Sequence, residues 1–456
     1  MQDNALSKIV ESIATEYGIP GVAVGVWADG QEFHANYGVT NIEAPVEVDS
    51  DTVFAIGSIS KTFTTTALLC LVADGKLDLD APVRHYLPEL VLADEHTAAT
   101  ITLRQLLNHT AGFDWNIIND MGEGDSALAD FTASLSELPL IAAPGERASY
   151  SQAGFNLLGR VIEKVTGQPF ETAVEDLVLT PAGLSETFYS RDAVMTRRFA
   201  VGHERQEDGT LSVSRQWKGN RANNAGGGIG ASVSELLRWA RFQLGDGHAE
   251  NGTPVLPADL LHLMQQPTVT LRASSLGDAI GLCWFLRDVD GVRTVGHGGS
   301  GFGQFAELLL VPARNFAVVI LSNASPEGIP TNLAILRWTL EHYLAVIDKD
   351  PTPIPFDPEI ARAITGHYEI DAMTIEITTE AETLTLDCKV KPEIRAAAPA
   401  AAIPQDHPPF EFALLPNNEY MITKGSFEGQ RGFFTYTPEG TVTGLDLAGR
   451  LFTRTA

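Results

Sequence analysis

A serine and a lysine lie three residues apart in the segment FAIGSISKTF, residues 54–63. Residues at this spacing are neighbours on one face of a helix, so the amine of Lys61 can reach the hydroxyl of Ser58. A serine activated by a neighbouring base can attack the carbonyl carbon of an ester or amide and become acylated. The same residues also fit an ordinary helix start in which Ser58 only caps the helix. Other segments of the chain decide between the two interpretations.

Acyl chemistry at Ser58 requires a second group that handles protons, because a lysine accepts a proton only in its neutral form. The segment ASYSQAGFNLLG, residues 148–159, provides Tyr150 just before a helical pattern of apolar residues. At the start of a helix its phenol can extend into a cleft. We therefore expect Tyr150 to be the second proton-handling group.

The oxyanion that forms during attack needs backbone N–H donors. The segment VGHGGSGFGQF begins as a strand, and we expect His297 at the end of that strand, followed by two glycines. Glycine at such a place lets another backbone approach closely. We expect the N–H groups of Ser58 and Ser300 to hold the oxyanion. The residues expected to contact the substrate in this segment are His297, Gly298 and Gly299.

Together these segments resemble the three motifs of the serine β-lactamase and penicillin-binding-protein superfamily, which are Ser-x-x-Lys, Tyr-x-Asn and Lys-Thr-Gly. They are similar in particular to the class C branch with its esterases and D-aminopeptidases, peptidase family S12. The connecting segments GKLDLDAPV, ITLRQLLNHTAGF and NAGGGIGASVSELLRWA are similar too. The resemblance covers roughly residues 5–345, and the remainder is more loosely similar to the small β-barrel appended to some S12 members.

The resemblance implies a role for each matching residue. Ser58 attacks a carbonyl group and becomes acylated, while Lys61 takes or relays the proton of the serine hydroxyl. Tyr150 protonates the leaving group and later activates water. Gln152 belongs to the second motif and is expected to line the substrate site. No cluster of His, Asp or Glu has metal-ligand spacing, so we expect no metal, and we expect no cofactor. We expect a small molecule or a peptide as the substrate.

Two departures from the family pattern bear on the substrate. The second motif has Gln152 where the family usually has Asn, so its amide sits one methylene further out. The third motif is His-Gly-Gly instead of Lys-Thr-Gly, which removes a permanent cation, because histidine is mostly neutral at pH 7. In β-lactamases this cation helps to bind the substrate carboxylate. The His-x-Gly form resembles D-aminopeptidases and some esterases, so we expect no β-lactamase activity.

The elements that must position these residues are those of an α+β protein. Two alternating apolar runs around Asp29-Gly30 predict a hairpin. Helical patterns dominate up to about residue 245, and residues 304–324 predict two further strands before a last helix. We therefore expect a β-lactamase-like antiparallel sheet flanked by helices, with a helical subdomain, in residues 1–347.

A second domain follows this catalytic part. Residues 348–358 contain four prolines and predict a linker. Residues 359–456 change to about eight short alternating runs, which predict a small all-β, lipocalin-like barrel. The Ala/Pro-rich stretch AAAPAAAIPQDHPP interrupts these runs and predicts a long loop.

The composition limits the partners that we expect. The chain has 456 residues and a formal net charge of −27, so nucleic acid and anionic lipid would be repelled. No stretch approaches the roughly 20 apolar residues that a membrane span requires. The N-terminal segment has the apolar stripe of a helix and no secretory signal, which predicts a cytoplasmic protein. The three cysteines are far apart and predict buried packing residues. The oligomeric state stays open.

Three functions fit these residues. The first is a serine hydrolase that cleaves small esters or peptides bearing D-residues. The second is an acyltransferase or cyclising thioesterase, in which an amine or alcohol resolves the same acyl-enzyme. The third is a non-catalytic binder of acyl groups or peptides, although a binder has no need to keep Ser58, Lys61 and Tyr150 together.

Overall fold

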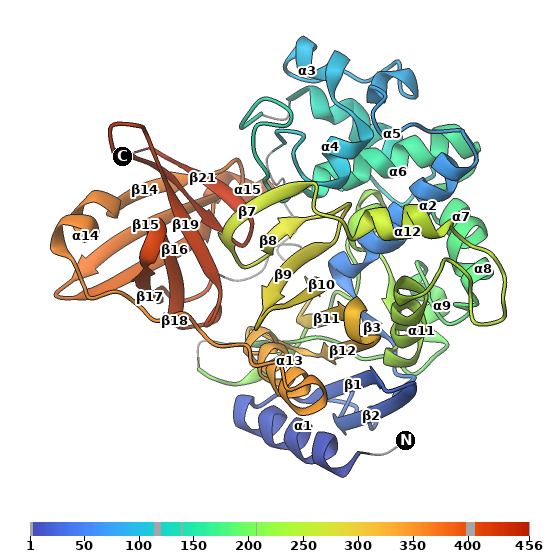
Figure 1. Ribbon diagram of the computed structural model, residues 1–456, viewed down its shortest axis with the longest axis horizontal. Coiled ribbons are helices and arrows are strands. Elements are labelled where there is room, and N and C mark those ends of the chain that lie inside the picture. Colours follow the sequence, from blue (N-terminus) through green and yellow to red (C-terminus); the bar gives the residue numbers. More distant parts are fainter. Residues whose placement is uncertain (1–2, 114–119, 138–139, 207, 398–405, 456) are drawn as a thin grey trace.

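The computed structural model describes residues 3–455, apart from 114–119, 138–139, 207 and 398–405. Its centre is an eight-stranded sheet with the strand order β2-β1-β12-β11-β10-β9-β8-β7, in which all neighbours are antiparallel (Figure 1). The strand bounds are β1 Gly21–Ala28, β2 Gln31–Gly38, β7 Val269–Ser274, β8 Gly277–Ile280, β9 Phe285–Val289, β10 Val292–Gly301, β11 Gln304–Val311 and β12 Phe316–Ser322.

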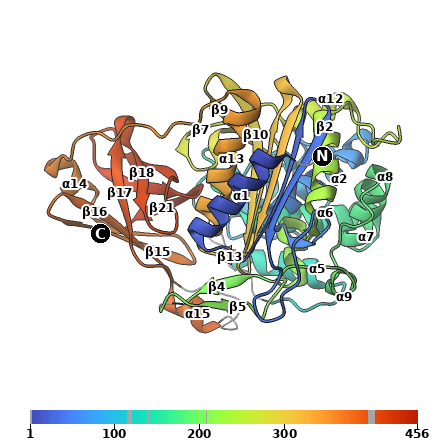
Figure 2. The same cartoon turned by 90° about the horizontal axis from the view of Figure 1, so that it is seen from below.

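Helices cover both faces of the sheet (Figure 2). On one face lie α1 (Asn4–Tyr17) and α13 (Gly328–Leu344), and on the other lie α2 (Ser60–Ala73) and α11 (Val233–Leu244). Side chains alternate between the faces of a strand. In β1, Ala23 packs with α2 and α11, whereas the valines on either side of it pack with α1 and α13. Burial on both faces explains why the central strands are almost entirely apolar.

A helical subdomain lies beside the sheet, at the top of Figure 1. Its central helix, α6 (Gln152–Thr166), packs against α2, α4 (Leu103–Leu107), α5 (Ala127–Ser134) and α7 (Phe170–Val174). The helix ends at Gly167, whose φ of 71° is the left-handed conformation that glycine adopts readily. The predicted antiparallel sheet with flanking helices and a helical subdomain is therefore confirmed.

Smaller elements complete the catalytic part. A two-stranded sheet joins β3 to β6 next to the Ser58 segment, and a three-stranded sheet has the order β13-β4-β5. The bounds are α3 Glu95–Thr100, α8 Thr180–Ala182, α9 Arg191–Met195, α10 Asn224–Gly227, α12 Ala258–Met264, β3 Phe54–Ala55, β4 His203–Arg205, β5 Leu211–Val213, β6 Gly230–Ala231 and β13 Ala324–Ser325.

The C-terminal part is a closed eight-stranded barrel, β14 to β21, as the short alternating runs predict. It has its own apolar core, in which Tyr368, Tyr420 and Phe452 are buried. The bounds are α14 Pro358–Ile364, β14 Gly366–Glu369, β15 Met373–Glu380, β16 Thr383–Val390, α15 Pro392–Ala397, β17 Phe410–Leu415, β18 Glu419–Lys424, β19 Arg431–Tyr436, β20 Val442–Leu447 and β21 Arg450–Arg454. Most of the predicted Ala/Pro-rich loop lies outside the described residues.

The barrel packs against the edge of the central sheet. Figure 1 places β21 and β19 beside β7, and the N–H of Ser275 donates a hydrogen bond of 3.0 Å to the carbonyl of Arg431 in β19. The barrel therefore closes the end of the sheet that is furthest from β2.

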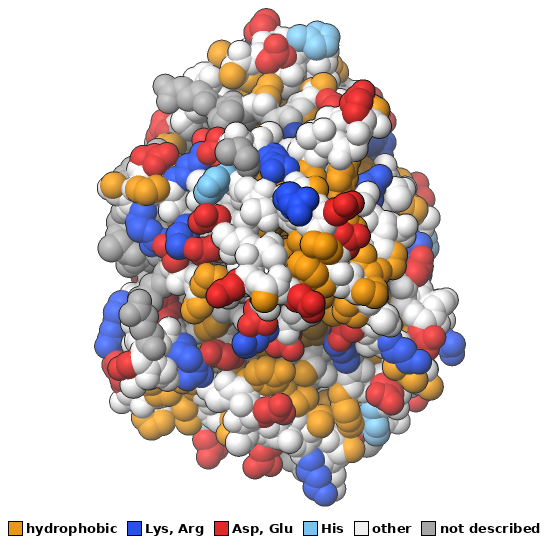
Figure 3. Space-filling model, turned by 90° about the vertical axis from the view of Figure 1, so that its left-hand side faces the viewer, with side chains coloured by type: hydrophobic (Ala, Val, Ile, Leu, Met, Phe, Trp, Pro, Cys, Tyr) orange, Lys and Arg blue, Asp and Glu red, His pale blue; other side chains and the backbone are white. Residues whose placement is uncertain are grey.

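Charged side chains lie at the surface, and the cysteines lie inside the protein. Acidic and basic side chains are interspersed over the barrel side of the molecule (Figure 3). The three cysteines are buried, as predicted. Among the residues that the structure describes, no helix combines the length and the apolarity that crossing a membrane would demand. The cytoplasmic location stays a prediction.

Candidate active site

Ser58 lies in a single 3₁₀ turn, Gly57–Ile59, which leads directly into α2. The hydroxyl of Ser60 fixes this turn, because it donates to the carbonyl of Gly57 at 2.7 Å and accepts the N–H of Ile229 at 3.1 Å. Gly57 has a φ of 51°, and a Cβ there would lie 2.6 Å from the backbone nitrogen of Ser300. Only glycine fits both conditions.

Lys61 lies in the first turn of α2 and is completely buried. Its Nζ donates to Ser58 Oγ at 3.1 Å, to Gln152 Oε1 at 2.8 Å and to the carbonyl of Gly226 at 2.7 Å. Burial is the main cause that lowers the pKa of Lys61 from 10.5 to about 7; within this net shift Cys283 raises the pKa and the nearby Arg450 lowers it. Near neutral pH a large share of the amines is therefore unprotonated and able to accept the serine proton.

Tyr150 precedes α6 and is held by its neighbours in the chain. Ser151 caps the helix, because its Oγ accepts the N–H of Gly154 at 3.3 Å. His109 accepts the N–H of Ser151 on Nδ1 at 3.1 Å, and its carbonyl accepts the N–H of Ser149 at 2.9 Å. Burial holds the pKa of His109 well below its usual range, so the ring is a neutral acceptor. His109 therefore holds the segment that leads into α6.

The phenol of Tyr150 lies beside Ser58 and Lys61. It is 8% exposed and hydrogen-bonded to the side chain of Ser58, and its ring centre lies 4.9 Å from Lys61 Nζ. Burial raises the pKa of Tyr150, whereas the bond to Ser58 and the charge of Arg450 lower it. The resting phenol is therefore protonated and can donate to a leaving group. The structure brings together the serine, amine and phenol that the sequence predicts.

Gln152 contacts the lysine through its side-chain amide. Its Oε1 accepts from Lys61, and its Nε2 donates to Asn156 Oδ1 at 2.9 Å. A Cβ at Gly226 would lie 1.9 Å from that Nε2. The glycine therefore provides the space that the extra methylene of Gln152 needs.

The third motif lies on β10 directly beside the Ser58 turn. A Cβ at Gly299 would lie 2.0 Å from the carbonyl oxygen of Ile56 and 2.9 Å from the nitrogen of Ser58. Any side chain at this position would push the strand away from the turn. The close approach places the backbone nitrogens of Ser58 and Ser300 at the contact between the turn and the strand.

His297 lies within β10, not at its end, because the strand continues to Gly301. The prediction of a strand end is wrong because glycine usually weakens a strand. Here the two glycines lie within the strand and permit its contact with the Ser58 turn. The His297 ring is 2% exposed, lies 4.7 Å from the Phe285 ring and uses Nδ1 to bond the Gly298 carbonyl at 2.6 Å. Burial and the charge of Lys61 lower the pKa of His297 to about 3. His297 is therefore a neutral residue in the folded site.

Arg450 of the barrel lies at this site and is missed by the sequence analysis. Its guanidinium carbon is 5.2 Å from the centre of the Tyr150 ring. The N–H of Tyr150 also donates to the carbonyl of Gly449 at 2.7 Å. About 300 residues separate the two segments, and no local pattern in the chain links them. The barrel is therefore part of the active site.

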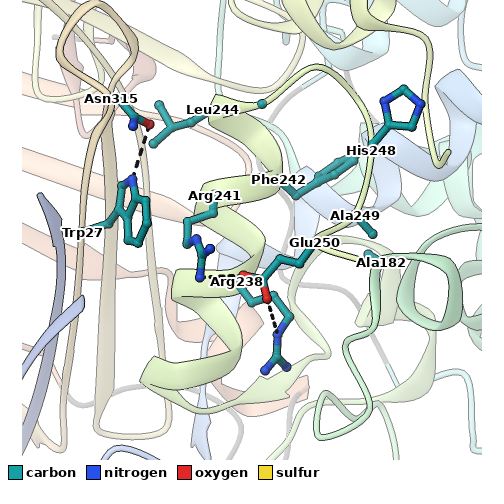
Figure 4. A pocket seen from close by; sticks show the side chains of 11 residues that line it. Trp27, Ala182, Arg238, Arg241, Phe242, Leu244, His248, Ala249, Glu250 and Asn315 are labelled. Atoms are coloured by element: carbon teal, nitrogen blue, oxygen red, sulfur yellow. Dashed lines mark hydrogen bonds and ion pairs between the residues drawn. The ribbon is translucent and has the colours of Figure 1, made fainter. Parts of the chain in front are cut away.

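A separate hollow lies between β1 and α11, away from these residues (Figure 4). It has a volume of about 200 Å³. Arg241 stacks 4.2 Å above the Trp27 ring and forms ion pairs with Glu32 and Glu250 at 2.9 and 2.6 Å. Because these carboxylates already neutralise the arginine, the hollow does not resemble an anion site.

Comparisons with known proteins agree with this geometry. The chain is 33% identical over 316 residues to penicillin-binding protein 4 of Amycolatopsis lactamdurans, which covers 69% of this chain and 83% of that protein. It is 27% identical over 334 residues to Protein flp of Staphylococcus aureus strain N315, covering 71% of this chain and 64% of that protein.

Solved structures share the fold. A crystal structure of SurE matches 99% of both chains with a TM-score of 0.74 and 24% identity. The octameric penicillin-binding protein homologue from Pyrococcus abyssi matches 98% of both chains with a TM-score of 0.67 and 21% identity. A class C β-lactamase from Rhodobacter sphaeroides matches 74% of this chain and all of its own, with a TM-score of 0.62 and 24% identity.

The beta-lactamase family model matches residues 6–338, which include all three motifs. Members of this family and of the related penicillin-binding proteins are generally serine hydrolases. With its appended eight-stranded barrel, this chain belongs to the beta-lactamase family.

Proposed function

We propose that this chain is a serine hydrolase that cleaves ester or amide bonds through an acyl-enzyme on Ser58. The observation that carries the proposal is the buried amine of Lys61, 3.1 Å from Ser58 Oγ, with its pKa lowered to about 7. A buried lysine of this kind has the properties of a general base at neutral pH. A protein that only binds peptides gains nothing from this arrangement.

Each step of the reaction has a candidate residue. Ser58 Oγ bonds to the carbonyl carbon while its proton passes to the neutral amine of Lys61, and the N–H groups of Ser58 and Ser300 hold the oxyanion. Collapse of this intermediate expels the alcohol or amine, which takes a proton from Tyr150. The phenolate formed in this way then removes a proton from water, which attacks the ester carbonyl. Collapse of this second intermediate releases the acid, and Lys61 returns its proton to Ser58 Oγ.

Small esters and peptides with D-residues are the proposed substrates. The neutral His297 offers no charge to a substrate carboxylate at the third motif. This supports an esterase or a D-aminopeptidase-like member of family S12 over a β-lactamase. The SurE fold, similar over the whole chain, has been solved with D-Leu, which makes D-leucine derivatives the first peptide-like probes to try.

The test compares p-nitrophenyl butyrate hydrolysis by the wild type, Ser58→Ala and Ser275→Ala. Ser275 is exposed in the turn between β7 and β8 and serves as the matched control. We expect activity to disappear only in Ser58→Ala, and D-leucine p-nitroanilide to be cleaved faster than its L-isomer. Full activity in Ser58→Ala, or no activity in the wild type on either class, would reject the proposal.

Acyl transfer is a second candidate, because the barrel covers the site. The turn that carries Gly449 lies on Tyr150, which is only 8% exposed, so the barrel covers the phenol that would activate water. If transfer is the natural reaction, adding D-leucine amide should divert most of the butyryl group to the α-amino nitrogen of this acceptor. An unchanged yield of butyrate with the acceptor present would leave hydrolysis as the function.

A further inference from the structure

The turn between β20 and β21 lies against the part of the chain that carries the catalytic phenol. Gly449 in this turn has a φ of 73°, and a Cβ there would lie 1.9 Å from the Cδ1 atom of Leu276 in the catalytic part. Its carbonyl accepts the N–H of Tyr150 at 2.7 Å. A side chain at this position would be strained by the left-handed backbone and would require the Leu276 side chain to move.

Asp446 anchors this turn from the barrel side. It is 5% exposed and hydrogen-bonded to the side chain of Ser274 in β7 and to the backbone of Gly449. The hydroxyl of Tyr420, from inside the barrel, donates to the Asp446 carbonyl at 2.6 Å. Arg450, which follows Gly449 in the chain, therefore lies on a hairpin that these hydrogen bonds hold in place.

The third motif of the family pattern carries a lysine, whereas this chain has His297 there. His297, which replaces that lysine, is neutral in the folded protein. The Arg450 guanidinium carbon lies 5.2 Å from the Tyr150 ring centre, and an arginine stays protonated at every pH of interest. The barrel thus restores a permanent cation beside the phenol.

We propose that Arg450 is a positioning residue, supplied by the barrel, whose permanent charge favours the proton-accepting forms of Lys61 and Tyr150. This inference rests on the proposed function. It assigns the barrel a direct electrostatic role in the reaction, in addition to closing the edge of the sheet.

The groups that face Tyr150 come from every element around it: Ser58, Lys61 of α2, His109, Cys283, His297 of β10 and Arg450 of β21. Arg450 lowers the pKa of both Lys61 and Tyr150. A lower pKa favours the neutral amine and the phenolate, which are the forms that accept a proton. Losing the charge therefore disfavours the neutral amine of Lys61, which takes the serine proton, and the phenolate of Tyr150, which activates water.

The experiment measures the pH profile of kcat/KM with p-nitrophenyl butyrate, a neutral substrate, for Arg450→Gln, Arg450→Met and Arg450→Lys. Arg454→Gln is the matched control, because Arg454 lies on the same strand but bonds the carbonyls of Ala363 and Thr365 within the barrel. We expect both neutral variants to move the acid limb upward by about one pH unit, with a roughly fivefold loss at pH 7 that recovers at higher pH. Arg450→Lys and Arg454→Gln should keep the wild-type limb.

Three outcomes would overturn the proposal. The first is an unmoved acid limb in both neutral variants. The second is an equal loss at all pH values that Arg454→Gln reproduces, which would assign Arg450 a structural role. The third is failure of both neutral variants to fold, which would assign it to docking of the barrel. The Ser58→Ala test separates these results from failure of the proposed function, since that variant is inactive only if Ser58 is the nucleophile.

Discussion

Replacing Lys61 by methionine tests whether its amine is neutral in the folded protein. Burial lowers the pKa of this completely buried lysine from 10.5 to about 7. The unfolded chain keeps the proton up to about pH 10, whereas the folded chain releases it above about pH 7. Between these values the unfolded state binds more protons, so stability rises with pH.

The expected change in unfolding free energy follows from the same pKa shift. One pKa unit corresponds to about 1.4 kcal/mol, so Lys61 should add about 2 kcal/mol to the unfolding free energy of the wild type between pH 7 and pH 9. Lys61→Met removes this gain, and it removes the general base, which should lower kcat by ~10²–10⁴-fold. In Lys61→Met the side-chain oxygen of Gln152 and the carbonyl of Gly226 lose their hydrogen-bond donor, which lowers the unfolding free energy equally at both pH values.

Urea unfolding of the wild type and Lys61→Met at both pH values measures this difference. Contributions from other titrating groups cancel when the two proteins are compared. Lys76→Met is the control, because the Lys76 side chain is 53% exposed and pairs with Asp74 at the surface. If the wild type and Lys61→Met change in parallel with pH, Lys61 is charged in the folded state and the assigned base is wrong.

Two further substitutions test the site and the barrel. Gly299→Ala should lower kcat by ~10²–10³-fold, because its Cβ would lie 2.0 Å from the Ile56 oxygen and displace the oxyanion donors. Ester hydrolysis by Gly301→Ala, whose Cβ meets nothing within 4 Å, should be unchanged, and equal rates in both variants would contradict the assignment. Burial raises the pKa of Asp446 to about 7, so the wild type loses stability as the pH rises from about 4 to 7, where the folded state binds more protons. Asp446→Asn should remove this loss of stability, which is worth up to about 4 kcal/mol. Urea unfolding at pH 4 and pH 8 measures the difference, and a variant with the same pH dependence as the wild type would refute this prediction.

The parts of the site that the sequence predicts are those set by local spacing. Ser58 and Lys61 lie one helical turn apart, and Tyr150 directly precedes the capping residue of its helix, so neighbouring residues suffice to place them. The same holds for the barrel strands, whose alternating side chains face one core.

The sequence analysis misses features that depend on tertiary packing. Strands β7 to β9 were not predicted, because β8 is only four residues long and the pairing of β7 with β8 is irregular between Thr270 and Ser274. Nothing in the local sequence distinguishes Arg450 from other arginines in hairpins, because its place at the site depends on how the barrel packs on the catalytic part. The neutral state of His297 depends on Phe285 and Lys61, which lie elsewhere in the chain.

The acyl-enzyme itself gives the most direct test of the central claim. Wild-type protein mixed with p-nitrophenyl butyrate, quenched in acid within its first turnovers and analysed by intact-mass and peptide mass spectrometry, should be heavier by one butyryl group. We expect that group on the peptide that contains Ser58, and no added mass in Ser58→Ala. Turnover without a covalent adduct, or the same adduct in Ser58→Ala, would contradict the account.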